Sequence, residues 1–238
     1  MKESLIVLTG VLYIVKQRWL PILKAVVIPM IIITAIDTVV DHVNDLENMA
    51  KPLRVMLSAA LGLLSLFQYT YVAVATHRIA ILGIGSVPEW GFKKYTKREG
   101  MFFFYSVALM LLSIVVMSTT SFVQNFFVIV IPIIFAFYVS IRFSLVFPAI
   151  AIDKALTLKE SWEYTRHKSI FMIMVTYIWP LMLFIPVLVI SFVAQAVGGY
   201  IAAFVDILFS AVVSVVFTII LITSLSLAYL RIVDYEDS

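Results

Sequence analysis

GMFFFYSVALMLLSIVVMSTTSFVQNFFVIVIPIIFAFYVSI, residues 100–141, contains no acidic or basic residue. A helix needs about 20 apolar residues to cross the hydrocarbon of a bilayer, so this stretch is predicted to hold two spans. The polar run STTSFVQN (118–125) marks the turn between them. A second stretch without acidic or basic residues, 169–205, also holds two spans, and Gly198 and Gly199 permit a tight reversal within it.

The composition of the whole chain agrees with this pattern. Its 238 residues are 63% hydrophobic and 13% charged, and the mean hydropathy is +1.09. A soluble domain usually carries about a quarter charged residues, so lipid must cover much of this surface. We predict an all-α, polytopic integral membrane protein, a single transmembrane domain with six spans in three hairpins. The spans are expected at about 21–40, 55–76, 101–119, 124–141, 169–193 and 202–230.

The apolar stretch Leu5–Val15 allows two other interpretations. As a seventh span it is too short, so we expect it to lie along the membrane interface. As a signal peptide it lacks a small-residue cleavage site, and Lys16 and Arg18 follow it directly, so we interpret it as mature chain.

The distribution of Lys and Arg predicts the orientation. All of these residues except Lys51 and Arg54 fall in the N-terminal region, in connections on one side of the membrane, or beside the last span. Since basic connections stay on the cytoplasmic side, both termini are expected in the cytoplasm.

The same connections contain a recurring pattern. Aromatic and basic residues mix before the first, third and fifth spans, and Tyr followed by Arg closes the second, fourth and sixth spans. The implied unit is a short basic amphipathic helix followed by a hairpin, at approximately 4–78, 88–142 and 153–231. Interfacial enrichment of Tyr and Arg produces the same pattern without any duplication, so both explanations stay open.

Residues 157–168 are predicted to form a short interfacial helix. Thr157-Leu-Lys-Glu160 matches the capping box, in which the Thr and Glu side chains satisfy free backbone N–H groups. Leu158, Trp162 and Thr165 follow a helical spacing and should share one face. Lys159 with Glu163, and Glu163 with Arg166 or His167, can pair on the opposite face. Pro148 is expected to break the chain between Arg142 and this helix.

Residues 142–166 also carry a family resemblance. Their run resembles the signature segment of YciC-type bacterial inner-membrane proteins, which is related to the membrane domain of some glycerophosphodiester phosphodiesterases. This chain departs from the family pattern at Leu156 and Lys159-Glu160, where members often have Gly or Pro and an Ala-rich helix start. The resemblance implies a six-span protein of the bacterial cytoplasmic membrane whose biochemical role is not established. The residues that carry it are Arg142, Pro148, Ala149, Asp153, Lys154, Leu156, Thr157, Ser161, Trp162 and Thr165.

Two charged residues are candidates for function. Asp206 lies within the last predicted span, and a carboxylate inside a membrane is a functional candidate by default. The alternative, which we favour, is that Asp206 meets water near the outer boundary or caps a helix start. Arg142 either holds a lipid phosphate or the carboxylate of a cytoplasmic helix, or it serves only as a topology anchor.

Several site classes are not expected. The three histidines, His42, His77 and His167, lack metal-ligand spacing, and the chain has no Cys, so we expect neither a metal nor a cofactor. No grouping of Ser, His and carboxylate occurs at a common membrane depth, so we do not expect an enzyme. The basic residues form no single patch, which argues against nucleic acid.

These observations lead to two hypotheses of different kinds. The first is a non-enzymatic structural, accessory or lipid-interacting component, whose stretches 157–168 and 88–99 dock to membrane lipids or to a membrane-protein partner. The second is a small-molecule or lipid transporter with a path between helices kinked at prolines. Such prolines more often only kink a helix whose neighbours satisfy it. The candidate kinks are Pro29, Pro132, Pro180 and Pro186.

Overall fold

The computed structural model describes residues 2–46, 48–90, 95–118, 126–198 and 215–234, and every regular element in these ranges is helical. The elements are α1 (Lys2–Asp45), α2 (Lys51–Leu82), α3 (Lys97–Ser118), α4 (Phe126–Phe143), α5 (Val146–Ala151), α6 (Leu158–Arg166), α7 (Ser169–Ile173), the π-helix η2 (Met174–Ile178), α8 (Trp179–Val197) and the π-helix η3 (Leu230–Asp234). A last span, Val215–Val233, runs into η3.

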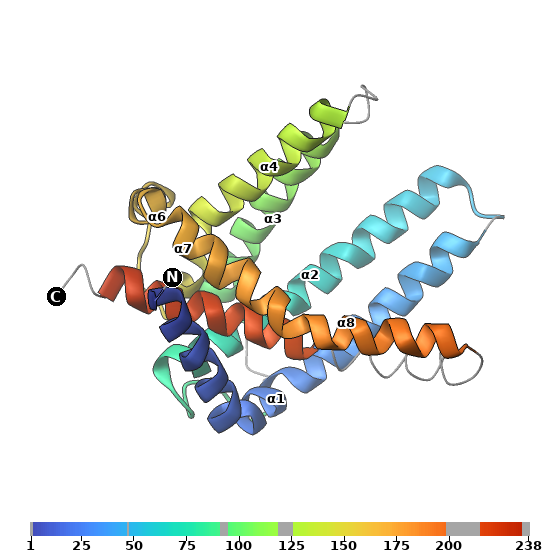
Figure 1. The fold of residues 1–238 in the computed structure, drawn as a ribbon. Coiled ribbons are helices and arrows are strands. Elements are labelled where there is room, and N and C mark those ends of the chain that lie inside the picture. Colours follow the sequence, from blue (N-terminus) through green and yellow to red (C-terminus); the bar gives the residue numbers. More distant parts are fainter. Residues whose placement is uncertain (1, 47, 91–94, 119–125, 199–214, 235–238) are drawn as a thin grey trace.

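The prediction of six spans is confirmed. Within the described residues, six helices are long and apolar enough to cross a membrane: Lys2–Asp45, Lys51–Leu82, Lys97–Val116, Val130–Ala151, Ser169–Ile190 and Val215–Val233. Figure 1 shows the hairpins diverging from a common end of the molecule, where α1 begins and η3 ends. We call this the convergent end. It is formed by the last turns of α2, the start of α3, α5 to α7 and the last turns of the final span.

The N-terminal region is continuous with the first span. Leu5–Val15 lies within α1 and is not a separate helix, and its location along the membrane interface stays a prediction. Figure 1 shows that the first turns of α1 run at an angle to the rest. Pro21 lies inside α1, and proline kinks a helix because it has no N–H to donate and its ring crowds the preceding turn. The first turns pack inward, with Val7 and Val11 buried against α5 and the last span.

Three clusters of buried apolar side chains hold the helices together. The largest joins the start of α1 to α5, η2 and the last turns of the final span, around Val11, Leu145 and Ile232. The second joins α1 to α2 and the last span, and the third joins α2 to α3 and α5. The convergent end is therefore the part of the molecule where all three hairpins meet.

The predicted break between Arg142 and the helix at 157–168 is confirmed, and it falls about one turn before Pro148. Helix α4 ends at Phe143, and a turn at Ser144 and Leu145 precedes α5, which contains Pro148. The physical reason is that Pro148 cannot donate to the carbonyl of Ser144, which instead accepts from the N–H of Phe147 at 3.3 Å. The break thus falls at the carbonyl that the proline leaves without its usual donor.

The four prolines predicted to kink spans lie inside helices. Pro29 is in α1, Pro132 in α4 and Pro186 in α8. Pro180 directly follows Trp179, at the point where η2 gives way to α8. Because Pro180 has no N–H, the carbonyl of Thr176 loses its usual helical donor, and the wider turn of η2 coincides with this loss.

The second basic stretch, 88–99, holds no separate helix in its described part. Residues 88–90 and 95–96 are non-helical, and α3 begins at Lys97. Only the third of the three stretches, which contains α6, forms a short helix set apart from its span. The threefold repeat itself stays a prediction.

Candidate functional site

Asp153 occupies an unusual position at the end of α5. Its φ of +62° lies in the left-handed region, which Asp tolerates better than most residues. The N–H of Asp153 donates to the carbonyl of Ile150 at 3.1 Å, and the N–H of Lys154 donates to that of Ala149 at 2.9 Å. This pair of bonds is a Schellman motif, which terminates the helix and turns the chain toward α6.

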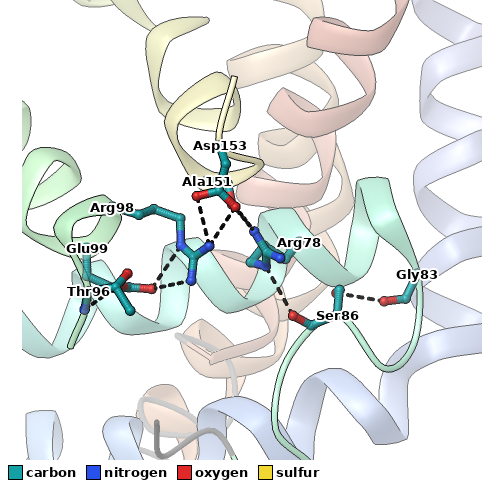
Figure 2. Close-up of polar contacts among 8 residues, drawn as sticks. All are labelled: Arg78, Gly83, Ser86, Thr96, Arg98, Glu99, Ala151 and Asp153. Atoms are coloured by element: carbon teal, nitrogen blue, oxygen red, sulfur yellow. Dashed lines mark hydrogen bonds and ion pairs between the residues drawn. The ribbon is translucent and has the colours of Figure 1, made fainter. Parts of the chain in front are cut away.

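Two arginines from different hairpins bind the Asp153 carboxylate (Figure 2). Arg78 of α2 donates from Nη1 to Oδ2 at 2.8 Å, and Arg98 of α3 donates from Nη1 to Oδ1 at 3.0 Å and to Oδ2 at 2.8 Å. Nη1 of Arg78 also donates to the carbonyl of Ala151 at 2.9 Å. The two arginine side chains are about 15% exposed, whereas that of Asp153 is 58% exposed. This cluster ties α2 and α3 to the end of α5.

A second carboxylate balances the charge of this cluster. Nε of Arg98 donates to Oε1 of Glu99 at 3.0 Å, and Oε2 of Glu99 accepts from the backbone N–H of Thr96 at 2.9 Å and from the Thr96 hydroxyl. The hydrogen bond from the N–H of Thr96 to Glu99 is one of the two bonds of a capping box at the start of α3. Sequence reasoning missed these contacts, although Thr96-Lys-Arg-Glu99 has the same spacing as Thr157-Leu-Lys-Glu160.

The predicted capping box of α6 is confirmed. The N–H of Glu160 donates to Oγ1 of Thr157 at 3.2 Å, and the N–H of Thr157 donates to Oε2 of Glu160 at 2.7 Å. The hydrogen bonds from Thr157 hold the pKa of the Glu160 carboxyl below its ordinary value.

The sequence spacing did not predict which face of α6 packs against the protein, and the structure shows that this face includes Ser161 and Thr165. Ser161 and Thr165 are fully buried, whereas Leu158 is 37% exposed. The Ser161 side chain faces the protein because its hydroxyl donates a hydrogen bond to the carbonyl of Arg142 at 2.7 Å. The ion pairs predicted among Lys159, Glu163 and Arg166 are absent from the described part of the chain.

Arg142 is the centre of this contact. Its side chain is buried, and Nη2 donates to the Tyr138 hydroxyl at 2.6 Å and to the carbonyl of Arg166, at the end of α6, at 3.4 Å. The guanidinium carbon lies 4.8 Å from the Tyr138 ring centroid and 5.2 Å from that of Trp162. No carboxylate of the described residues pairs with it. Aromatic faces and the negative end of a helix thus stabilise this cation, which favours the interpretation of Arg142 as a clamp for α6.

A third polar contact links α2 to the last span. Nδ1 of His77 lies 2.7 Å from Oγ of Ser226, and the His77 ring lies 6.1 Å from that of Phe102 in α3. Both His77 and Ser226 are buried. The residues that the structure describes contain no group of three His, Asp or Glu side chains that could hold a metal ion.

Two hollows lie beside α1. A cavity of about 260 Å³ is lined by α1 around Leu20 and by the loop that follows α2. A more apolar groove of about 710 Å³ runs along α1 from Val15 to Thr38, against the last span. Sequence reasoning did not predict the cavity, because its two walls lie about 60 residues apart in the chain.

Of the candidate residues, Arg142, Ser161, Trp162 and Thr165 lie together, and Asp153, Thr157 and Glu160 lie at the two ends of the connection from α5 to α6. Asp206 lies outside the described residues. No protein-family model, curated protein or solved structure matches this chain.

Proposed function

We propose that this chain is a non-enzymatic component of the bacterial cytoplasmic membrane, with both termini in the cytoplasm, and that it acts as an accessory protein which binds anionic lipid at its convergent end. The distribution of Lys and Arg supports this orientation. We also propose that it is a YciC-type protein, since the signature residues Arg142, Ser161 and Thr165 contact one another.

The observation that carries this function is the excess of Lys and Arg over Asp and Glu in the segments of the convergent end, where α6 presents two basic side chains outward. Glu160 is engaged in the cap of the helix, and Asp153 is engaged by two arginines. Lys159 and Arg166 are exposed, as is Glu163, and neither basic side chain lies within ion-pair distance of a carboxylate among the described residues. A helix clamped in place with basic side chains outward suits the anionic headgroups of the inner leaflet.

The test measures the anionic lipid that co-purifies with the full chain in a gentle detergent. A variant carrying Lys159→Gln and Arg166→Gln should retain roughly 30-fold less, because each basic residue near an anionic surface contributes about 1 kcal/mol. The matched control carries Lys51→Gln and Arg54→Gln and should behave as the unmodified chain. Equal retention by all three proteins would contradict the proposal, and so would a periplasmic signal from a reporter fused after Ser238.

One observation favours transport as a second candidate. Near Pro180, the hydroxyl of Thr176 and the indole N–H of Trp179 are buried without a hydrogen-bond partner in the described structure. Irregular helix turns with free polar groups line substrate paths in some transporters. Loss of uptake or lipid flipping in proteoliposomes on Pro180→Ala or Asp206→Asn, with folding intact, would favour this candidate over the accessory function.

A further inference from the structure

The cavity beside the bend of α1 combines an apolar lining with two opposite charges. Leu20 and Pro21 of α1 and Ile79, Ile84 and Val87 around the end of α2 form most of its wall. Lys24 and Glu89 are its charged lining residues, and Nζ of Lys24 lies 2.6 Å from Oε1 of Glu89. Its volume of about 260 Å³ is close to the lower end of the range for small-ligand sites.

The wall opposite α1 is held in place by hydrogen bonds. Nη1 of Arg18 donates to the carbonyls of Ile79 at 2.6 Å and of Ala80 at 3.2 Å, which satisfies free groups at the end of α2. The hydroxyl of Ser86 donates to the carbonyl of Gly83 at 2.8 Å, and Nε of Arg78 donates to the carbonyl of Ser86 at 3.1 Å. The loop that carries Glu89 is therefore positioned before any ligand arrives.

The ion pair itself can exchange partners. The Lys24 side chain is 34% exposed and that of Glu89 is 67% exposed, and exposed ion pairs contribute little to stability. The Glu89 carboxylate is charged at neutral pH, and the hydrogen bond from Lys24 lowers its pKa further below the ordinary value. Each group is thus available to a ligand that offers it a new partner of the right sign.

We propose that this cavity binds the headgroup of a phospholipid bearing a primary amine, with the phosphate on Lys24 and the amine on Glu89. The charges of Lys24 and Glu89 cancel. A zwitterionic headgroup can therefore replace Glu89 as the partner of Lys24 and Lys24 as the partner of Glu89. A headgroup with a net negative charge would pair with Lys24. It would leave the Glu89 carboxylate without a cationic partner and would repel it.

The position of the cavity identifies a lipid as the source of this headgroup. Trp19 and Trp90 are both 56% exposed, and Trp is enriched where a membrane meets water. The Trp90 ring centroid lies 5.6 Å from Nζ of Lys24, so the aromatic ring borders the charged pair. The apolar wall below the pair suits the glycerol and the first acyl carbons of a bound lipid. This site is separate from α6, so either proposal can fail without the other.

The test is a lipid-binding titration by native mass spectrometry, with phosphatidylethanolamine, phosphatidylglycerol and phosphatidylcholine of matched acyl chains. The full chain carrying Lys159→Gln and Arg166→Gln serves as the parent protein for all variants, so that anionic lipid held at α6 does not contribute. This parent should prefer the ethanolamine lipid to both others. Lys24→Gln should weaken binding of that lipid about tenfold, because a charge-assisted hydrogen bond is lost. Glu89→Gln should reverse the preference toward phosphatidylglycerol, since it leaves the site with a net positive charge.

Two further variants separate a binding site from a structural ion pair. The double variant Lys24→Glu with Glu89→Lys keeps one charge of each sign and should retain the ethanolamine preference. Asp45→Asn, at the distal end of α1, also removes one negative charge, lies away from both proposed sites and should leave all three affinities unchanged. Equal binding of the choline and ethanolamine lipids would overturn the proposal, and so would an unaltered preference in a folded Glu89→Gln variant.

Discussion

The convergent end and the distal halves of the hairpins, residues 31–46, 48–66, 104–118, 126–134 and 181–198, are stabilised by different interactions. At the convergent end, Arg78, Arg98 and Arg142 donate to backbone carbonyls, hydroxyls or carboxylates of other helices. In the distal halves, large apolar side chains such as Phe104 and Phe192 are mostly exposed, by 69% and 74%. Lipid surrounds such side chains before and after folding, so little free energy depends on their identity. Polar contacts at helix ends, by contrast, fix how the hairpins meet.

The largest effect is expected when the clamp on α6 is removed. Arg142→Ala should destabilise the folded chain by about 3 kcal/mol, since it removes hydrogen bonds from a cation and two aromatic contacts. Arg54→Ala is the matched control in the distal region, where Arg54 donates to the carbonyls of Asn44 and Leu46. Unfolding in mixed detergent and lipid micelles measures both. Equal losses of unfolding free energy in Arg142→Ala and Arg54→Ala would show that polar contacts stabilise the convergent end and the distal halves equally.

A smaller effect is expected at Asp153. Asp153→Asn keeps a residue that tolerates the left-handed conformation but removes the charge shared by two arginines, and should cost about 1–2 kcal/mol. Asp153→Gly relieves the backbone while removing both contacts. If the glycine variant were as stable as the unmodified chain, backbone strain rather than the arginine contacts would dominate at this position.

Acid should weaken α6 through Glu160. Hydrogen bonding lowers the folded-state pKa of Glu160, so its contribution is complete above the unfolded-state pKa of about 4.3 and is lost as the pH falls through the lowered value. Hydrogen exchange of residues 158–166, corrected for intrinsic rates, should therefore show less protection below about pH 4. In Glu160→Gln the pH dependence of this protection should be reduced. An unchanged dependence in this variant would show that another group causes it.

The smallest effect is expected in the distal halves. Phe104→Ala should change the free energy of unfolding by less than about 0.5 kcal/mol, because the side chain faces away from the protein. Phe102→Ala, two residues away in the same helix, is the control at the convergent end, where Phe102 is buried. It should cost about 3 kcal/mol or more. A large loss for Phe104→Ala would indicate that another protein surface covers this face.

The sequence alone determined the six spans and the cap of α6. Both are local properties, because every backbone group in lipid must be satisfied within its own helix and a capping box spans only four residues. The sequence also indicated Arg142 as a candidate, either to hold a phosphate or a carboxylate or to serve as a topology anchor, but it did not show which groups contact its charge.

Only the tertiary structure decided the rest. The partners of Asp153, the buried face of α6 and the packing of the first turns of α1 all differ from, or were absent from, what the pattern predicted. In each case the deciding contact joins residues far apart in the chain: Arg78 to Asp153, Arg142 to Ser161, and Val11 to the last span. Helix periodicity reports which residues share a face, but it does not report which neighbour that face will meet, because the neighbour is set by the packing of whole hairpins.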